Sequence, residues 1–251
     1  MKELISVNET IDLLKNHRSI RKFKDKSLSR EQIETIVNAA QSASTSSFVQ
    51  AYSIIGVSDP NLKKQLAQLA GGQSYVEKNG YFLMFCADYH RHKLAAGIEG
   101  VNINRNLESM ESFMVALIDT ALAAQNAAIA AESMDLGICY IGGIRNNIAK
   151  VSELLNLPDY VIPLFGMAIG YPLEESSLKP RLPFNAIFHE NGYEDKRAEI
   201  EEYNEIISAY YRVRTNGLRQ DKWTEQIIRM LTSKQREFMM DFVNSKHFAL
   251  K

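Results

Sequence analysis

Two basic segments, far apart in the sequence, contain residues that together could bind a phosphate group. The first reads HRSIR at residues 17–21, and the second reads KPR at residues 179–181. In an extended segment alternate side chains share a face, so His17, Ser19 and Arg21 can point one way while Arg18 and Ile20 point elsewhere. The chemistry predicted for this face is the binding of an anion by charged hydrogen-bond donors.

The second segment has the same alternate spacing of cations. The proline between Lys179 and Arg181 fixes its own φ and keeps Lys179 out of the helical region, which favours an extended form. Taken alone, each segment is also typical of an ordinary basic surface loop. The occurrence of both segments in one chain favours the interpretation that they are two halves of a single anion clamp.

A glycine pair forms a third candidate feature. Gly142 and Gly143 directly follow an apolar run that ends at Ile141. One interpretation is a simple turn. The other is a place where backbone N–H groups approach a flat ligand with no Cβ in the way.

Several other chemistries lack their motifs. The sequence contains neither a G-x-G-x-x-G after a strand nor a P-loop, and it has no G-x-S-x-G or credible Cys/His pair. His90 and His92 have no metal-ligand spacing to acidic partners, so we expect no metal site. No general acid–base group or covalent nucleophile emerges from the sequence.

Composition is that of an ordinary soluble globular protein. The chain has 251 residues, 45% of them hydrophobic and 24% charged, and its net charge is −1. Without a dominant basic tract, we expect no nucleic-acid partner. Cys86 and Cys139 sit in apolar runs and indicate buried thiols in a reducing compartment, and the N-terminus has no signal-peptide core. We therefore expect a cytoplasmic protein with no membrane partner.

Helical and extended patterns alternate along the chain. Ser29 and Gln32 form a capping-box pattern before a helix that reaches the Ser/Thr cluster at 42–47, and Asp59-Pro60 starts a second helix that ends at Gly71-Gly72. Strands are predicted at 52–57, 81–87, 138–141 and 162–169, and further helices at 148–155 and through most of 195–251.

The longest predicted helix covers 110–134 and ends at Gly137. It is apolar nearly all round and rich in alanine between Ala121 and Ala131, so we expect it to be buried on most faces, in a domain core or a dimer interface. The order of elements predicts an α/β or α+β sheet protein. A long buried helix disfavours a simple doubly wound sheet.

Five stretches together resemble the nitroreductase superfamily, and more narrowly its NADPH-dependent flavin reductase and oxygen-insensitive nitroreductase branch. They are HRSIRKF at 17–23, the Ser/Thr cluster running into FVQ at 48–50, AGGQSYVE at 70–77, YIGGIRN at 140–146 and KPRLP at 179–183. The resemblance implies an α+β fold, with a mixed β-sheet flanked by helices, in an intertwined homodimer with FMN at the interface. It also implies an FMN-binding core at 1–194 and a C-terminal helical extension at 195–251 of the same domain unit.

The resemblance also implies roles for individual residues. The clamp residues His17, Ser19, Lys179 and Arg181 would hold the FMN phosphate with Arg18 beside it, and Arg21 would reach the flavin ring. The other implied flavin contacts are Gln73, the backbone of Tyr140, Ile141, Gly142 and Gly143, and Thr45, Ser46 and Ser47 from the partner subunit. Phe48 and Tyr75 are implied walls of the substrate channel.

The implied activity is ping-pong electron transfer from NADPH to free flavin, quinones or nitroaromatic compounds. In this branch the preference for NADPH is carried by arginines that match Arg214 and Arg219, on either side of a mobile loop at Asn216-Gly217. A basic helix end with no nucleotide role is the alternative for these arginines. The alternative for the whole chain is a flavin- or anion-binding protein without turnover.

Overall fold

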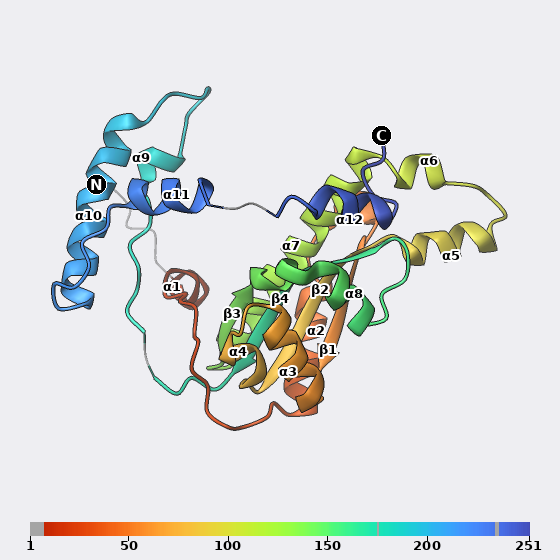
Figure 1. Ribbon diagram of the computed structural model, residues 1–251, viewed down its shortest axis with the longest axis horizontal. Helices are drawn as coiled ribbons and strands as arrows, with labels where there is room; N and C mark the ends of the chain where they lie inside the picture. Colours follow the sequence, from red (N-terminus) through yellow and green to blue (C-terminus); the bar gives the residue numbers. More distant parts are fainter. Residues whose placement is uncertain (1–7, 175, 234–235) are drawn as a thin grey trace. The chain divides into compact units, whose positions relative to one another are not determined.

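The computed structural model describes residues 8–174, 176–233 and 236–251 and is shown in Figure 1. The chain is compact in two units. One runs up to Ser176 and takes in Phe238–Lys251, and the other is Ser177–Glu237. This boundary differs from the division predicted at residue 194. That 195–251 acts as an extension of a flavin-binding core stays a prediction.

A four-stranded sheet forms the centre of the first unit (Figure 1). Its strands are β1 (Tyr52–Val57), β2 (Tyr81–Asp88), β3 (Gly137–Ile141) and β4 (Val161–Gly170), in the order β1-β2-β4-β3. All four predicted strands are confirmed to within one residue at each end. Each pairing between the described strands is antiparallel, whereas the resemblance implied a mixed sheet.

Helices cover both faces of the sheet, and the central strand β2 buries side chains on both of its faces. Leu83 and Phe85 of β2 pack against α2 (Arg30–Gln41) and α7 (Met110–Glu132). The intervening Phe82 and Met84 pack on the opposite face with α3 (Pro60–Leu69), the 3-10 helix η2 (Gly142–Asn147) and α8 (Ile148–Leu154). The α+β class with flanking helices is confirmed.

The predicted helix starts are confirmed at the level of single hydrogen bonds. The Ser29 hydroxyl accepts from the Gln32 backbone N–H, and the Gln32 side chain accepts from the Ser29 N–H. Asp59 Oδ1 accepts from the Leu62 N–H at 2.8 Å, with Pro60 as the first helical residue of α3.

Helix α7 differs from its prediction in two ways. It ends at Glu132, and the turn that follows uses Asp135 at φ 57° before Gly137 begins β3. Only its alanine-rich side is buried, while Met114, Ile118 and Leu122 are 44–53% exposed in the single chain. In the single chain burial is therefore limited to one side of α7, and burial of the other side in a dimer interface stays a prediction. Its length and composition would also suit a membrane span, but the alanine side packs on the sheet.

The remaining short elements of this unit are α1 (Glu9–Lys15), η1 (Ser46–Phe48), α4 (Ser74–Glu77), α5 (His90–Ile98), α6 (Asn104–Leu107) and α12 (Met239–Ser245). Beyond α12, Phe248 is fully buried against Tyr89 and Phe113. The Lys251 carbonyl accepts from the Met110 N–H at 3.0 Å, so the end of the chain caps the start of α7.

The second unit contains α9 (Phe184–Ile187), α10 (Arg197–Arg214) and α11 (Trp223–Leu231). Its small core joins Tyr203, Ile207 and Tyr211 of α10 to Trp223 of α11. The helical character predicted for 195–251 is thus confirmed by α10, α11 and α12.

Candidate functional site

The first half of the predicted clamp runs beside strand β3. The Ile20 N–H donates to the Ile138 carbonyl at 2.9 Å, which aligns residues 17–21 with the strand. Burial raises the pKa of the Cys139 thiol, while the Arg21 charge and a hydrogen bond with Ser19 oppose the rise. Ser19 and Arg21 therefore lie close to Cys139.

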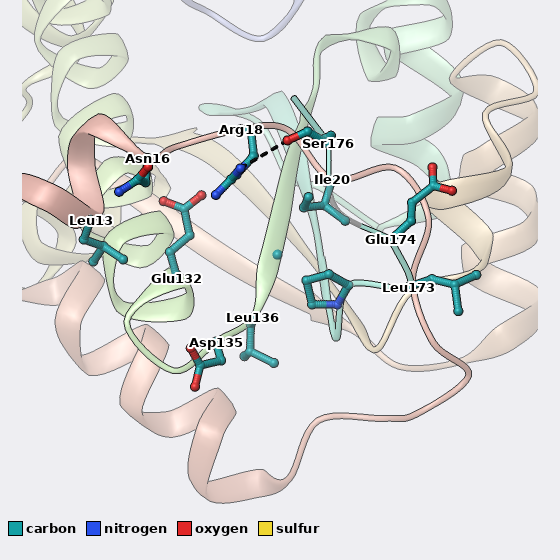
Figure 2. Close-up of a pocket in the computed structure, with 12 residues that line it drawn as sticks. Leu13, Asn16, Arg18, Ile20, Glu132, Asp135, Leu136, Leu173, Glu174 and Ser176 are labelled. Atoms are coloured by element: carbon teal, nitrogen blue, oxygen red, sulfur yellow. Dashed lines mark hydrogen bonds between the residues drawn. The ribbon is translucent and has the colours of Figure 1, made fainter. Parts of the chain in front are cut away.

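Arg18 and Ile20 point elsewhere, into a cavity of about 440 Å³ between α1, the end of α7 and residues 172–174 and 176 (Figure 2). Arg18 Nη1 donates to the Ser176 carbonyl there at 3.2 Å. The prediction that alternate side chains point in opposite directions is confirmed here, because Arg18 and Ile20 point one way and Ser19 and Arg21 the other. That Arg18 lies beside a phosphate stays a prediction.

His17 has a partner that the sequence analysis missed. Its Nδ1 lies 2.6 Å from Oε1 of Glu132, the last residue of α7, and the two side chains are 26% and 13% exposed. An ionised carboxylate only accepts hydrogen bonds, so Nδ1 carries the proton in this pair. The sequence signal that could have revealed Glu132 is an acidic residue at the end of an apolar helix.

The second half of the clamp belongs to the second unit. Residues 176–183 form neither helix nor strand, as expected around Pro180. The Pro180 carbonyl accepts from the Tyr203 hydroxyl at 2.7 Å, and the Lys179 ammonium lies 5.3 Å from the centre of the Tyr211 ring. Burial raises the pKa of Tyr203, and the nearby Arg181 charge opposes the rise. That these two cations share one phosphate with His17 and Ser19 stays a prediction.

Gln73 and the glycine pair lie together in the first unit. A Cβ on Gly143 would lie 2.5 Å from the Ala70 carbonyl oxygen and 3.3 Å from Gln73 Nε2. Close packing of Ala70 therefore accounts for this glycine without any ligand. Gln73 Oε1 is buried, and within the described part of the chain it receives no hydrogen bond.

The serine-rich turn at Thr45, Ser46 and Ser47 is held by a buried carboxylate. Asp119 of α7 is fully buried and accepts from the Ser46 N–H at 2.9 Å and the Ala51 N–H at 3.1 Å. Ser47 and Phe48 adopt positive φ of 46° and 59° within this turn. Asp119 was missed, although a lone carboxylate in the middle of an apolar helix is the signal for it.

Three aromatic residues belong to the predicted flavin and substrate contacts. Phe48 is 82% exposed in the single chain, and Tyr75 is half-buried beside α3. Burial raises the pKa of the Tyr140 phenol, and the negative charge of Glu132 adds to the rise. Their roles in the substrate channel and at the ring stay predictions.

The two candidate nucleotide arginines are both held by tyrosines of α10. Arg214 Nη1 donates to the Tyr210 hydroxyl at 2.6 Å, and the Arg219 guanidinium lies 4.2 Å from the centre of the Tyr211 ring. Arg219 Nε also donates to Asp221 Oδ2 at 2.8 Å.

The predicted helix break between these arginines is confirmed. Asn216 and Gly217 have φ of 49° and 84°. The Gly217 N–H donates to the Arg212 carbonyl and the Arg219 N–H to the Thr215 hydroxyl, so hydrogen bonds define the turn that was expected to be mobile.

Comparison with known families decides what kind of protein carries this site. A family model described as the nitroreductase family matches residues 14–171, and one described as the C-terminal domain of that family matches residues 179–251. The chain belongs to the nitroreductase family. The interval between the two matches contains Ser176 and Ser177, where the compact units divide.

Nitroreductase-family relatives match over nearly the whole chain. The FMN reductase (NADPH) of Bacillus subtilis is 55% identical over 246 residues, which cover 96% of this chain and 99% of that protein. An NADPH-dependent oxidoreductase of Staphylococcus haemolyticus is 48% identical over 239 residues, covering 93% and 95%.

Solved structures of the family agree with the fold. A nitroreductase from B. subtilis has a TM-score of 0.95 at 54% identity and covers 96% of this chain and 100% of its own. An NADPH:FMN oxidoreductase from Vibrio harveyi, solved in complex with NAD+, has a TM-score of 0.87 at 39% identity, with coverage of 97% and 100%.

FMN fits the nitroreductase-family residues on chemical grounds. The Ser19 and Arg21 side of the first segment supplies donors suited to an anion. The buried Gln73 oxygen lacks a donor within the described residues, and the imide N–H of a flavin ring is such a donor. Within the same described residues no cluster of three metal-ligating side chains occurs.

Proposed function

We propose that this protein is an FMN-containing oxidoreductase that takes electrons from NADPH and passes them to free flavin, quinones or nitroaromatic compounds. The observation that carries the proposal is similarity over 96% of this chain to an FMN reductase (NADPH), in a chain that contains both halves of the predicted anion clamp. The Gln73 oxygen, which receives no hydrogen bond from the described residues, supports the flavin as ligand.

FMN, when bound, supplies the electron-transfer chemistry, which accounts for a site without an acid–base pair or nucleophile. In this proposal His17, Ser19, Lys179 and Arg181 bind the phosphate. Arg21 places its positive charge next to the flavin ring. Gln73 and the backbone from Tyr140 to Gly143 orient the ring. Thr45, Ser46 and Ser47 act from a second subunit.

The strength expected of the clamp is sufficient for a resident cofactor. A phosphate monoester carries about −1.5 to −2 charges at neutral pH. Hydrogen bonds to charged groups contribute roughly 1.5–3 kcal/mol each. Three or four of them supply most of the binding free energy of a micromolar or tighter complex, which is about −8 kcal/mol or more favourable.

The proposal includes a homodimer in the cytoplasm. Met114, Ile118 and Leu122 leave an exposed apolar stripe on α7, and Phe48 is also exposed in the single chain. Burial of such apolar surface against a second copy of the chain is energetically favourable, because it removes the surface from water. The two cysteines are buried free thiols, in keeping with a reducing compartment.

The alternative is a flavin- or anion-binding protein that does not turn over. We expect the purified protein to be yellow, with one noncovalent FMN per chain, and we expect NADPH added without oxygen to bleach the visible flavin band. Adding an excess of a quinone should then restore the colour. A yellow protein that NADPH leaves unbleached would favour the alternative. A colourless protein that does not take up FMN would contradict the proposal and would leave only the anion-binding form of the alternative.

Replacing Arg21 separates its effect on the reduction potential of the flavin ring from its effect on FMN binding. If its guanidinium stabilises the reduced cofactor, Arg21→Ala should lower the reduction potential of the bound flavin by about 30 to 60 mV, the equivalent of one charged hydrogen bond in a two-electron couple. Arg21→Lys should fall between the alanine variant and the wild type. Potentiometry with flavin bound measures the effect, and an unchanged potential in Arg21→Ala would refute this role.

A further inference from the structure

We propose that Glu132 is a positioning residue that holds His17 in the orientation required to bind the FMN phosphate. The inference rests on the proposed function and adds a residue that no clamp motif contains. Its basis is the 2.6 Å contact between Glu132 Oε1 and His17 Nδ1, between side chains that are mostly buried.

The contact connects His17 to a helix that packs on the central sheet. Glu132 ends α7, whose alanine side packs on the sheet, whereas His17 lies in the irregular segment after α1. A carboxylate on one imidazole nitrogen fixes the tautomer and the direction of the ring, as it does for metal-bound histidines. Because Nδ1 donates to Glu132, Nε2 is the nitrogen left to face a phosphate oxygen, and it donates there only in the doubly protonated imidazolium form.

The charge of Glu132 also matters, and its effect depends on His17. With His17 present, a carboxylate at Nδ1 stabilises an imidazole that donates from both nitrogens, which strengthens its bond to a phosphate. With His17 absent, the same carboxylate would repel the phosphate directly. Removal of the Glu132 charge should therefore have opposite effects in the two backgrounds.

The first test compares two ligands that differ only in the phosphate. Glu132→Gln keeps an acceptor for Nδ1–H but removes the charge, and we expect it to weaken FMN binding about five- to tenfold while riboflavin binding is unchanged. Apoprotein titrations followed by flavin fluorescence give both affinities. The matched control is Glu174→Gln, which removes a carboxylate from the same cavity (Figure 2) where it pairs with Lys22, outside the clamp; it should change neither affinity.

The second test uses the His17→Ala background. We expect the double variant His17→Ala with Glu132→Gln to bind FMN more tightly than His17→Ala alone. Equal losses for FMN and riboflavin in Glu132→Gln would mean a merely structural role and would overturn the inference. So would the same FMN loss in both backgrounds. Failure of the unaltered protein to bind FMN would instead overturn the proposed function.

Discussion

Replacing Lys179 and Arg181 together by alanine is expected to release FMN from the purified protein. Two charged contacts to phosphate contribute roughly 3–6 kcal/mol together, so the dissociation constant should rise by about two to four orders of magnitude. Lys179 packs only loosely over the Tyr211 ring and Arg181 is exposed, so the second unit should remain folded. The flavin absorbance retained after gel filtration, against protein concentration, measures the loss.

A matched control removes two cations of the same unit that have only surface partners. Arg197 pairs with Glu201 and Lys222 with Glu205, so the double alanine variant at Arg197 and Lys222 should keep its FMN. Fluorescence of Trp223, the single tryptophan, reports on the core around Tyr203 in both variants. Full flavin absorbance in the Lys179 and Arg181 variant, with that core intact, would refute the phosphate assignment.

Arg214→Ala and Arg219→Ala are each expected to lower kcat/KM for NADPH by about ten- to a hundredfold, with little change for NADH. NADPH differs from NADH only in its 2′-phosphate, and loss of one charged contact to that group costs roughly 1.5–3 kcal/mol. The tyrosines of α10 hold both guanidiniums in place, Tyr210 through its hydroxyl and Tyr211 through its ring. The two arginine side chains then lose little conformational freedom when they bind the 2′-phosphate.

Arg229 provides the control residue for the Arg214 and Arg219 variants. It donates to Asp221 Oδ1 at 3.4 Å, on the same carboxylate that holds Arg219, but it lies on α11 away from the Asn216-Gly217 turn. Arg229→Ala should therefore leave the ratio of NADPH to NADH activity unchanged. Steady-state kinetics with both nucleotides measure the ratio, and equal losses for NADH and NADPH in Arg214→Ala and Arg219→Ala would show that these arginines do not read the 2′-phosphate.

Local patterns predicted the elements of this protein well. Ser29 and Gln32 cap α2 reciprocally, Asp59-Pro60 begins α3, and β1 has the predicted bounds 52–57. These features depend on residues two to four positions apart, whose geometry the backbone itself imposes. The opposite directions of Ser19 and Ile20 followed from the same short-range periodicity.

Contacts between distant residues could not be predicted in this way. Glu132 meets His17 across 115 positions, and Asp119 meets the Ser46 N–H across 73. No periodicity links such residues, because the antiparallel sheet order and the packing of α7 on the sheet bring them together. Both carboxylates appeared in the sequence only as polar exceptions in an apolar helix.

The sequence by itself thus determined the four strands, the capped starts of α2 and α3, the family motifs and which side chains of residues 18–21 share a face, because all of these depend on near neighbours. Only the tertiary structure decided that α7 buries one side and exposes the other, that Phe238–Lys251 returns to the first unit, and that Glu132 supports His17. The physical reason is that burial and charge pairing are properties of neighbours in space, and the chain topology chooses those neighbours.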